Sequence, residues 1–274
     1  MTRVWVDGHM VDAAEPAVSA FDHGLLTGDG VFETLKVYDG TVFAVRRHLE
    51  RLAHSAAGLG LGLRPDAELR SVMDEVVAAN AVGDGRVRVT VTGGPSPLGS
   101  ERGAGGPTTI VAAAPQAPWP DSTEVAVVPW PRNERGALAG LKTTSYGENV
   151  VALAWAKERG AGEALFPNLA GNLCEGTGTN VFVGIDGRLV TPPLSSGCLA
   201  GVTRALVIEL NGAVEEDLPA AVLQAADEAF LTSTTREVQP IAAADGRPLP
   251  TVPGPLTQAA AASFTALVAR DMDP

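Results

Sequence analysis

The sequence has few cysteines and no long apolar run, and each shortage excludes a class of protein. Two cysteines, Cys174 and Cys198, cannot build a disulfide framework, and alone they cannot make a zinc site. No apolar stretch approaches the roughly 20 residues that a membrane span requires. The first residues enter a strand pattern directly, without the apolar segment of a signal peptide. We therefore expect a cytoplasmic protein that does not associate with membranes.

Positive charge is scarce as well. The 274 residues include 20 Lys plus Arg against 32 Asp plus Glu, which gives a formal net charge of −12. Such an acidic chain has no electrostatic reason to bind nucleic acid, so local arginines must hold any phosphate that it binds. The four histidines show no metal-ligand spacing with a carboxylate, and GxSxG, Walker and Rossmann motifs are missing. We expect no metal site.

The composition and the element pattern are those of a folded protein with two parts. Hydrophobic residues make up 45% of the chain, which is typical of a globular protein. The segment 115–121, PQAPWPD, contains three prolines and favours an extended connector. Strand and helix patterns occur on both sides of it. They predict an α+β or α/β fold, with a smaller N-terminal α/β domain over 1–114 and a larger C-terminal domain over 122–274.

Asp-Gly pairs mark the turns of this fold. Both residues are typical of tight hairpin turns that need positive φ. Four of the six Asp-Gly pairs in the chain separate two strand patterns, at 7–8, 39–40, 186–187 and 245–246. We predict a turn between two strands at each of them.

Lysine is rare, with only Lys36, Lys142 and Lys157 in the chain. Lys36 lies in an alternating strand pattern, and Lys157 ends a helical run, where a cation complements the helix dipole. Lys142 follows the small apolar run GALAGL and precedes two threonines, a serine and a tyrosine. An amine in such surroundings, without an adjacent acid, is a candidate for imine chemistry. The alternative is a surface lysine in a loop, which this stretch alone favours because lysine is seldom buried.

Two segments are candidates for binding an anion. Residues 199–204, LAGVTR, place backbone amides at the opening of a helix, where unpaired N–H groups and the helix dipole attract negative charge. Residues 231–238, LTSTTREV, form a hydroxyl-rich turn after an apolar strand. Plain helix capping and an ordinary Ser/Thr turn are the alternatives. Together the segments indicate a phosphate on an aldehyde cofactor.

Glu175 and Arg51 are charged residues with two interpretations each. Glu175 ends an apolar strand and enters the run Gly-Thr-Gly-Thr. Its carboxylate can hold the protonated pyridine nitrogen of pyridoxal phosphate, or it can face water at the strand end. Arg51 can reach a phosphate, or it can be a solvated residue of its helix.

Six segments occur in the order seen in class IV aminotransferases, which the chain resembles over nearly its whole length. The segments are GDGVFETLKVYDG, RRHLERLAHSA, LKTTSYGENV, EALFPNLAGNLCEGTGTNVFV, LVTPPLSSGCLAGVTR and FLTSTTREVQPI. The family includes branched-chain aminotransferases, D-amino acid aminotransferases and 4-amino-4-deoxychorismate lyases. The resemblance implies a two-domain fold with pyridoxal phosphate held between the halves, in a homodimer whose partner completes each site.

The same resemblance implies a role for each candidate residue. Lys142 matches the Schiff-base lysine, Glu175 the carboxylate paired with the pyridine nitrogen, and Arg51 the phosphate-binding arginine. Tyr146 matches a tyrosine that several members place beside the cofactor. The family's backbone-amide grip and second hydroxyl turn match Val202, Thr203, Ser233 and Thr234. Substrate contacts are expected at Arg88, Phe32 and Thr235.

Three segments bear on the reaction. D-amino acid aminotransferases carry an Arg-x-His carboxylate trap where this chain reads Pro-Leu-Gly-Ser over 97–100, which argues against that activity. Branched-chain enzymes tend to have Tyr-x-Arg where residues 86–88 read Arg-Val-Arg, so only Arg88 fits. Lyases tend to have a threonine in the Phe-x-Thr pattern of residues 32–34, which Thr34 supplies.

From these segments we favour a 4-amino-4-deoxychorismate lyase of folate synthesis, which forms 4-aminobenzoate and pyruvate. The resemblance implies an external aldimine, proton abstraction by Lys142, and protonation of the departing enolpyruvate by Thr34. The alternative is an aminotransferase that moves an amino group from a branched-chain amino acid or an (R)-amine to a keto acid. A relative that has lost catalysis and serves as a binding or scaffold protein is the third hypothesis.

Overall fold

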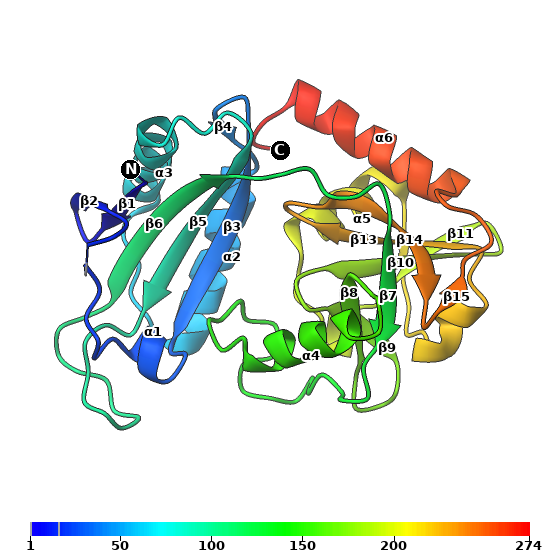
Figure 1. The fold of residues 1–274 in the computed structure, drawn as a ribbon, viewed down its shortest axis with the longest axis horizontal. Helices are drawn as coiled ribbons and strands as arrows, with labels where there is room; N and C mark the ends of the chain where they lie inside the picture. Colours follow the sequence, from blue (N-terminus) through cyan, green and yellow to red (C-terminus); the bar gives the residue numbers. More distant parts are fainter. Residues whose placement is uncertain (1, 16) are drawn as a thin grey trace. The chain divides into compact units, whose positions relative to one another are not determined.

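The computed structural model describes residues 2–15 and 17–274. The chain forms two compact units, shown in Figure 1. Unit 1 contains Met1–Ala117, Leu141–Tyr146 and Asp271–Pro274, and unit 2 contains Pro118–Gly140 and Gly147–Arg270. The first change of unit falls inside the proline-rich segment 115–121. The segment around Lys142 groups with unit 1, outside the range 1–114 expected for the first domain.

Unit 1 is an antiparallel sheet of six strands with helices on one face (Figure 1). The strand order is β2-β1-β6-β5-β3-β4. The strands are β1 (Arg3–Val6), β2 (His9–Asp12), β3 (Gly30–Tyr38), β4 (Thr41–Val42), β5 (Gly85–Thr92) and β6 (Thr108–Pro115). The helices are α1 (His23–Leu26), α2 (Val45–Leu59) and α3 (Asp66–Ala79).

The two faces of this sheet differ because side chains alternate along each strand. On β3, Val31, Leu35 and Val37 enter the core under α2 and α3, together with Leu49 and Leu52 of α2. The alternate residues of β3 lie on the opposite face, and they are Phe32, Thr34, Lys36 and Tyr38. The second face of β3 therefore carries an aromatic ring, a hydroxyl and an amine next to β5.

Residues 141–146 extend the sheet at the edge of β3. The Phe32 amide donates to the Lys142 carbonyl at 3.0 Å, and the Thr144 amide donates to the Gly30 carbonyl at 2.8 Å. Val31 and Thr143 form an antiparallel bridge between them. Backbone hydrogen bonds thus fix the position of Lys142 against the first residues of β3.

Unit 2 is built on a mixed sheet of nine strands, in the order β12-β11-β10-β13-β14-β7-β8-β9 with β15 paired to β14. The strands are β7 (Thr123–Val127), β8 (Glu163–Pro167), β9 (Leu173–Gly176), β10 (Asn180–Ile185), β11 (Arg188–Thr191), β12 (Val214–Glu215), β13 (Glu228–Ser233), β14 (Glu237–Ala244) and β15 (Arg247–Pro248). The helices are α4 (Gly147–Lys157), α5 (Val202–Asn211) and α6 (Pro255–Arg270), with short 3₁₀ turns η1 (Leu194–Ser196) and η2 (Ala220–Gln224).

The helices of unit 2 pack against the sheet through separate apolar clusters. Ala152 and Ala156 of α4 pack with Phe166 of β8. Val207 of α5 and Ala260 of α6 pack with β10 and β13. None of the helices in the described residues, 2–15 and 17–274, has the length and apolar character needed to cross a membrane.

The predicted turns are confirmed by the backbone. Asp7, Asp39, Asp186 and Asp245 have φ of 45°, 45°, 50° and 50°, and the glycine after each also has positive φ. Each pair joins two neighbouring antiparallel strands. The mixed α and β architecture in two units confirms the predicted fold class.

Candidate active site

Lys142 lies beside the aromatic ring of Phe32. Its backbone amide donates to the Ser55 hydroxyl at 3.0 Å, and its Nζ is 4.5 Å from the centroid of the Phe32 ring. Ser55 is fully buried on α2, and Phe32 is 5% exposed. The amine is therefore held on the sheet edge by β3 and α2, and an aromatic face attracts its protonated form.

Two more of the expected residues contact the same ring, and a third lies on the same face of the sheet. The Arg88 guanidinium carbon is 3.6 Å from the Phe32 centroid, and Tyr146 packs edge-to-face on Phe32 with centroids 5.3 Å apart. Thr34 lies directly opposite Arg88 in the pairing of β3 with β5, so the two share a face. Burial lowers the pKa of Arg88, which Tyr146 partly opposes. Unit 1 thus brings an amine, a guanidinium and two aromatic rings together.

Arg51 makes two hydrogen bonds on the helix side of β3. Its Nε donates to Oε1 of Glu33 at 2.7 Å, and its Nη2 donates to Oε2 at 2.7 Å. His48 lies 2.7 Å from Oε2 of Glu33 through Nδ1. Burial alone would raise the pKa of Glu33, but Arg51 and His48 lower it to about 2. Burial lowers the pKa of His48, and Glu33 partly opposes this.

Glu33 and His48 were missed by the reasoning from sequence. Glu33 alternates with apolar residues on the inward face of β3, and its side chain is fully buried. A carboxylate at a core-facing strand position is seldom found without a charged partner. The position of Glu33 in the strand pattern therefore indicates a buried charged partner. That partner is Arg51, on the next helix along the chain.

Arg102 was also left unassigned, although it lies in the loop where D-amino acid aminotransferases carry their carboxylate trap. Its Nε and Nη2 donate to Asp29 at 2.6 Å and 2.5 Å, and its Nη1 donates to the Gly60 carbonyl at 3.2 Å. The hydrogen bond from Arg102 lowers the pKa of Asp29, against the effect of burial. Arg102 therefore ties the loop to its own unit through Asp29.

In unit 2, Glu175 is held at the end of β9. Its Oε2 accepts a hydrogen bond from the Leu199 amide at 2.8 Å, and its Oε1 lies 3.3 Å from Nε of Arg132. The Arg132 guanidinium stacks on Phe166, 4.1 Å from the ring centroid, and Phe166 is the strand partner of Glu175. Since an adjacent positive charge favours an ionised carboxylate, Arg132 stabilises the anionic form of Glu175. Arg132 lies in an irregular loop, and nothing in the sequence singled it out.

The first turn of α5 is the predicted anion site. Its N-cap, Gly201, has φ −65° and ψ 135° and supplies no side-chain cap, so the amides of Val202 and Thr203 are not capped from that position. A Cβ on Gly201 would lie 2.0 Å from Oδ1 of Asn180, so a larger residue would require Asn180 to move. Asn180 also donates through Nδ2 to the Leu199 carbonyl at 2.9 Å. Glu175 and Asn180 thus fix the loop that leads into α5.

The second hydroxyl turn joins β13 to β14. The Ser233 hydroxyl accepts from the Arg236 amide at 3.1 Å, so it has a structural role in the turn. Thr234 and Thr235 are half-buried at its tip. Thr232 pairs with Asn180 across β13 and β10, which places the turn next to the loop before α5. Unit 2 therefore gathers Glu175, the α5 amides and the hydroxyl turn around one end of its sheet.

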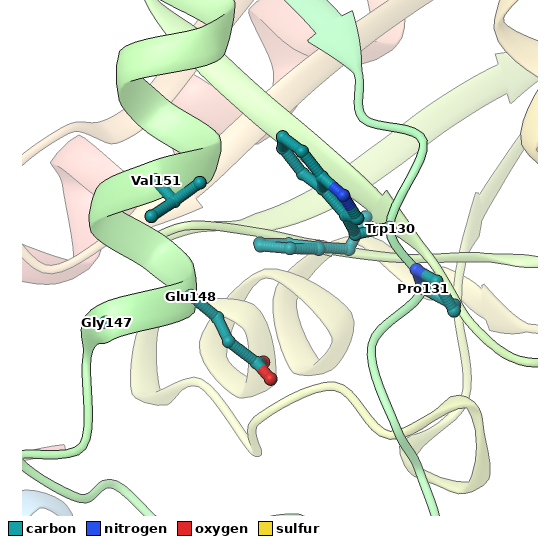
Figure 2. A pocket seen from close by; sticks show the side chains of 6 residues that line it. Trp130, Pro131, Gly147, Glu148 and Val151 are labelled. Atoms are coloured by element: carbon teal, nitrogen blue, oxygen red, sulfur yellow. The ribbon is translucent and has the colours of Figure 1, made fainter.

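Unit 2 contains a pocket of about 310 Å³. Its lining is drawn in Figure 2, where the Trp130 ring lies across from Val151 of α4. Pro131, Gly147, Glu148 and Phe166 complete its lining. The pocket is mostly apolar, and none of the residues expected in the site lines it. Its link to the site is Phe166, on which Arg132 stacks.

The remaining reactive groups are not suited to catalysis. Cys174 and Cys198 are buried and free. Burial raises the pKa of both thiols, that of Cys198 to about 11, so they remain protonated and unreactive near neutral pH. Among residues 2–15 and 17–274 no group of three His, Cys, Asp or Glu side chains is placed to hold a metal ion.

Comparison with known proteins decides the family. The family model described as amino-transferase class IV matches residues 30–244. The chain belongs to the class IV aminotransferase family. This confirms the resemblance seen in the six sequence segments. Enzymes of this family use pyridoxal phosphate, so the protein is a pyridoxal-phosphate-dependent enzyme.

Two relatives of similar sequence are named as aminotransferases. A putative branched-chain-amino-acid aminotransferase of Methanocaldococcus jannaschii is 36% identical over 255 residues, which cover 89% of this chain and 88% of that one. A D-alanine aminotransferase of Bacillus licheniformis is 34% identical over 265 residues, with 93% of each chain covered. The preference for a lyase that the sequence suggested is not confirmed by these relatives.

Solved structures show the same fold. The branched-chain aminotransferase of Escherichia coli has a TM-score of 0.92 and 28% identity, and covers 97% of this chain and 94% of its own. The branched-chain aminotransferase of Thermoproteus uzoniensis, solved with norvaline, has a TM-score of 0.90 and 34% identity, over 97% and 94%. A putative 4-amino-4-deoxychorismate lyase of Legionella pneumophila has a TM-score of 0.87 at 24% identity, over 94% and 97%, which shows the fold alone.

Proposed function

We propose that this class IV enzyme is an aminotransferase that moves the amino group of a 2-amino acid to a 2-oxo acid. The observation that carries the proposal is the Phe32 ring, which has the Lys142 amine on it at 4.5 Å and the Arg88 guanidinium at 3.6 Å. An amine that moves protons and a cation that anchors a carboxylate are the two groups that an amino acid substrate requires. The aminotransferase relatives support this choice over the lyase.

We propose that four groups expected from the family resemblance hold pyridoxal phosphate. They are Lys142, Arg51, Glu175 and the backbone amides at the start of α5. These residues fit pyridoxal phosphate. The Gly201 N-cap supplies no side-chain cap to the first turn of α5, whose amides can bind a phosphate, and the Glu175 carboxylate lies next to Arg132. When bound, the cofactor supplies an electron sink that stabilises negative charge on the substrate carbon. The further contacts expected with the cofactor are Ser233 and Thr234, and Thr235 is expected to contact the substrate.

Each residue then has a task in the reaction. Lys142 takes the proton from the substrate carbon that bears nitrogen and returns a proton later. Glu175, with Arg132 3.3 Å away, would hold the protonated ring nitrogen of the bound cofactor. Phe32 packs against the amine, and Tyr146 packs edge-to-face on Phe32. The homodimer and the cytoplasmic location expected from the sequence stay predictions.

The lyase is the second candidate, because Thr34 places a hydroxyl on the same face as Arg88, directly opposite it. A threonine there can donate a proton to a departing carbon, which amino transfer does not need. Thr34→Val is expected to leave amino transfer within about threefold of wild type, because the change keeps the shape and removes only the hydroxyl. Loss of amino transfer in Thr34→Val would show that the hydroxyl serves the transferase.

A paired assay separates the two functions. Purified protein with pyridoxal phosphate is given L-leucine or D-alanine with 2-oxoglutarate, and a second sample is given 4-amino-4-deoxychorismate. We expect glutamate to form in the first sample. Release of 4-aminobenzoate and pyruvate in the second, without glutamate in the first, contradicts the proposal and establishes the lyase.

Arg88 is expected to anchor the substrate carboxylate. In Arg88→Ala we expect kcat/KM for the amino acid to fall by about 10- to 100-fold, the loss of a charge-assisted hydrogen bond. Arg86→Ala is the matched control, since Arg86 lies two residues earlier on the same face of β5. Equal losses in both variants would mean that general positive charge on this face, and not a specific anchor, assists binding.

A further inference from the structure

Glu33 and His48 have no role in the reaction given above, and both lie against Arg51, which is proposed to contact the cofactor. Glu33 is completely buried, His48 is 1% exposed, and the Arg51 side chain is 10% exposed. Burying a carboxylate is costly unless charged and hydrogen-bonded partners surround it. Glu33 lies between Phe32 and Thr34 on β3, and its side chain is on the opposite face of the sheet from theirs.

We propose that Glu33 is a positioning residue that aims the Arg51 guanidinium at the phosphate of the cofactor. The inference rests on the proposed function only in taking Arg51 as a phosphate ligand. It adds that the Glu33 carboxylate determines the orientation of the Arg51 guanidinium, and that His48 holds the Glu33 carboxylate in place.

The hydrogen bonds define which edge of Arg51 is used. Glu33 accepts from Nε and Nη2, the side-on edge of the guanidinium, at 2.7 Å each. The planar group therefore has its end-on edge, which includes Nη1, directed away from Glu33. Two parallel hydrogen bonds fix both the position and the plane of the guanidinium, which a single contact does not.

His48 completes the arrangement from the same helix. The low pKa of Glu33 keeps the carboxylate ionised, so Nδ1 of His48 must carry the proton that it shares with Oε2 at 2.7 Å. Nη2 of Arg51 is also only a donor, so its 3.5 Å approach to Nδ1 is a contact and not a hydrogen bond. Both donors thus converge on Glu33, and the carboxylate cannot turn without losing one of them.

The location of Arg51 agrees with a task near Lys142. Arg51 lies one helical turn before Ser55, whose hydroxyl accepts from the Lys142 amide at 3.0 Å. Side chains four residues apart on a helix are neighbours on one face. Glu33 follows Phe32 on β3, and Phe32 contacts the Lys142 amine. One strand and one helix therefore fix both the amine and the guanidinium.

The test compares pyridoxal phosphate with pyridoxal, which lacks the phosphate. Dissociation constants of both are measured on the apoprotein by absorbance, for wild type, Glu33→Gln, Arg51→Met and the double variant. We expect Glu33→Gln to bind pyridoxal phosphate about tenfold more weakly or worse, and pyridoxal within about threefold of wild type. In the Arg51→Met background, Glu33→Gln is expected to change neither constant, because the two residues act as one unit.

Other results overturn the inference. Equal weakening of both ligands by Glu33→Gln means that Glu33 has only a structural role, and an unchanged affinity for pyridoxal phosphate means that Arg51 needs no positioning. If Arg51→Met itself leaves the affinity for pyridoxal phosphate unchanged, the assignment of Arg51 in the proposed function is the step that fails. Glu33→Asp, which keeps the charge but withdraws it by one methylene, gives the same comparison if Glu33→Gln does not fold.

Discussion

Lys142→Ala is expected to abolish turnover, with kcat reduced by roughly 10⁴-fold or more, because the variant lacks both the covalent attachment point and the base. Borohydride reduction of the wild type should fix pyridoxal phosphate to the peptide that contains Lys142, and mass spectrometry should find no such adduct in the variant. The expectation rests on the placement of the amine over Phe32, on a backbone that β3 and Ser55 hold.

The other two lysines are the controls. Lys157→Ala changes an exposed residue of the last turn of α4 and should keep full activity and a normal adduct. Lys36 is the more demanding control, because it lies on β3 on the same face as Phe32. An adduct that persists in Lys142→Ala and disappears in Lys36→Ala would move the attachment point to Lys36.

Local features of the fold could be predicted from the sequence. Asp-Gly turns depend on two adjacent residues, and the four turns predicted from such pairs are confirmed. The other two pairs, at 29–30 and 84–85, lead into β3 and β5. The alternation along β3 separates a core face from a polar face by its period alone. The carboxylate of Glu33 interrupts the core face, and this local signal was readable but was not used.

Contacts between distant segments could not be predicted in this way. Residues 141–146 pair with the start of β3, more than 100 residues earlier, and no periodicity in either segment encodes the partner. Arg132 lies beside Glu175, which is on β9, the strand that pairs with β8. The loop that contains Arg132 has no periodic sequence pattern that would predict this contact. Such pairs form only when the tertiary structure forms. The family resemblance therefore identified Lys142 and Glu175 but not the residues that support them, such as Ser55 and Arg132.

The choice of reaction shows the same limit. Thr34 led the sequence reasoning towards a lyase, because a hydroxyl at that position has a use in expelling pyruvate. The structure places that hydroxyl opposite Arg88, an arrangement that serves either reaction. The Phe32 ring, with the Lys142 amine and the Arg88 guanidinium against it, also suits either reaction. The relatives therefore weigh more than a single side chain, and they are named as aminotransferases.

Glu175→Gln is expected to retain bound pyridoxal phosphate but to slow proton abstraction by roughly 10²- to 10⁴-fold. A neutral amide keeps the size of the side chain and the hydrogen bond from Leu199, but it removes the charge that keeps the ring nitrogen protonated. The absorbance spectrum of the bound cofactor and single-turnover rates with the amino acid measure the two effects separately.

Glu148→Gln is the matched control for this prediction. Glu148 also lies near Arg132, at 3.6 Å, but its side chain is 77% exposed, and pairs at the surface contribute little. We expect wild-type rates in that variant, since Arg132 keeps its contacts with Glu175 and Phe166. If Glu175→Gln turned over as fast as Glu148→Gln, the carboxylate would have no part in the electron sink. The Arg132–Glu175 pair would then be a structural contact that holds the loop before α5.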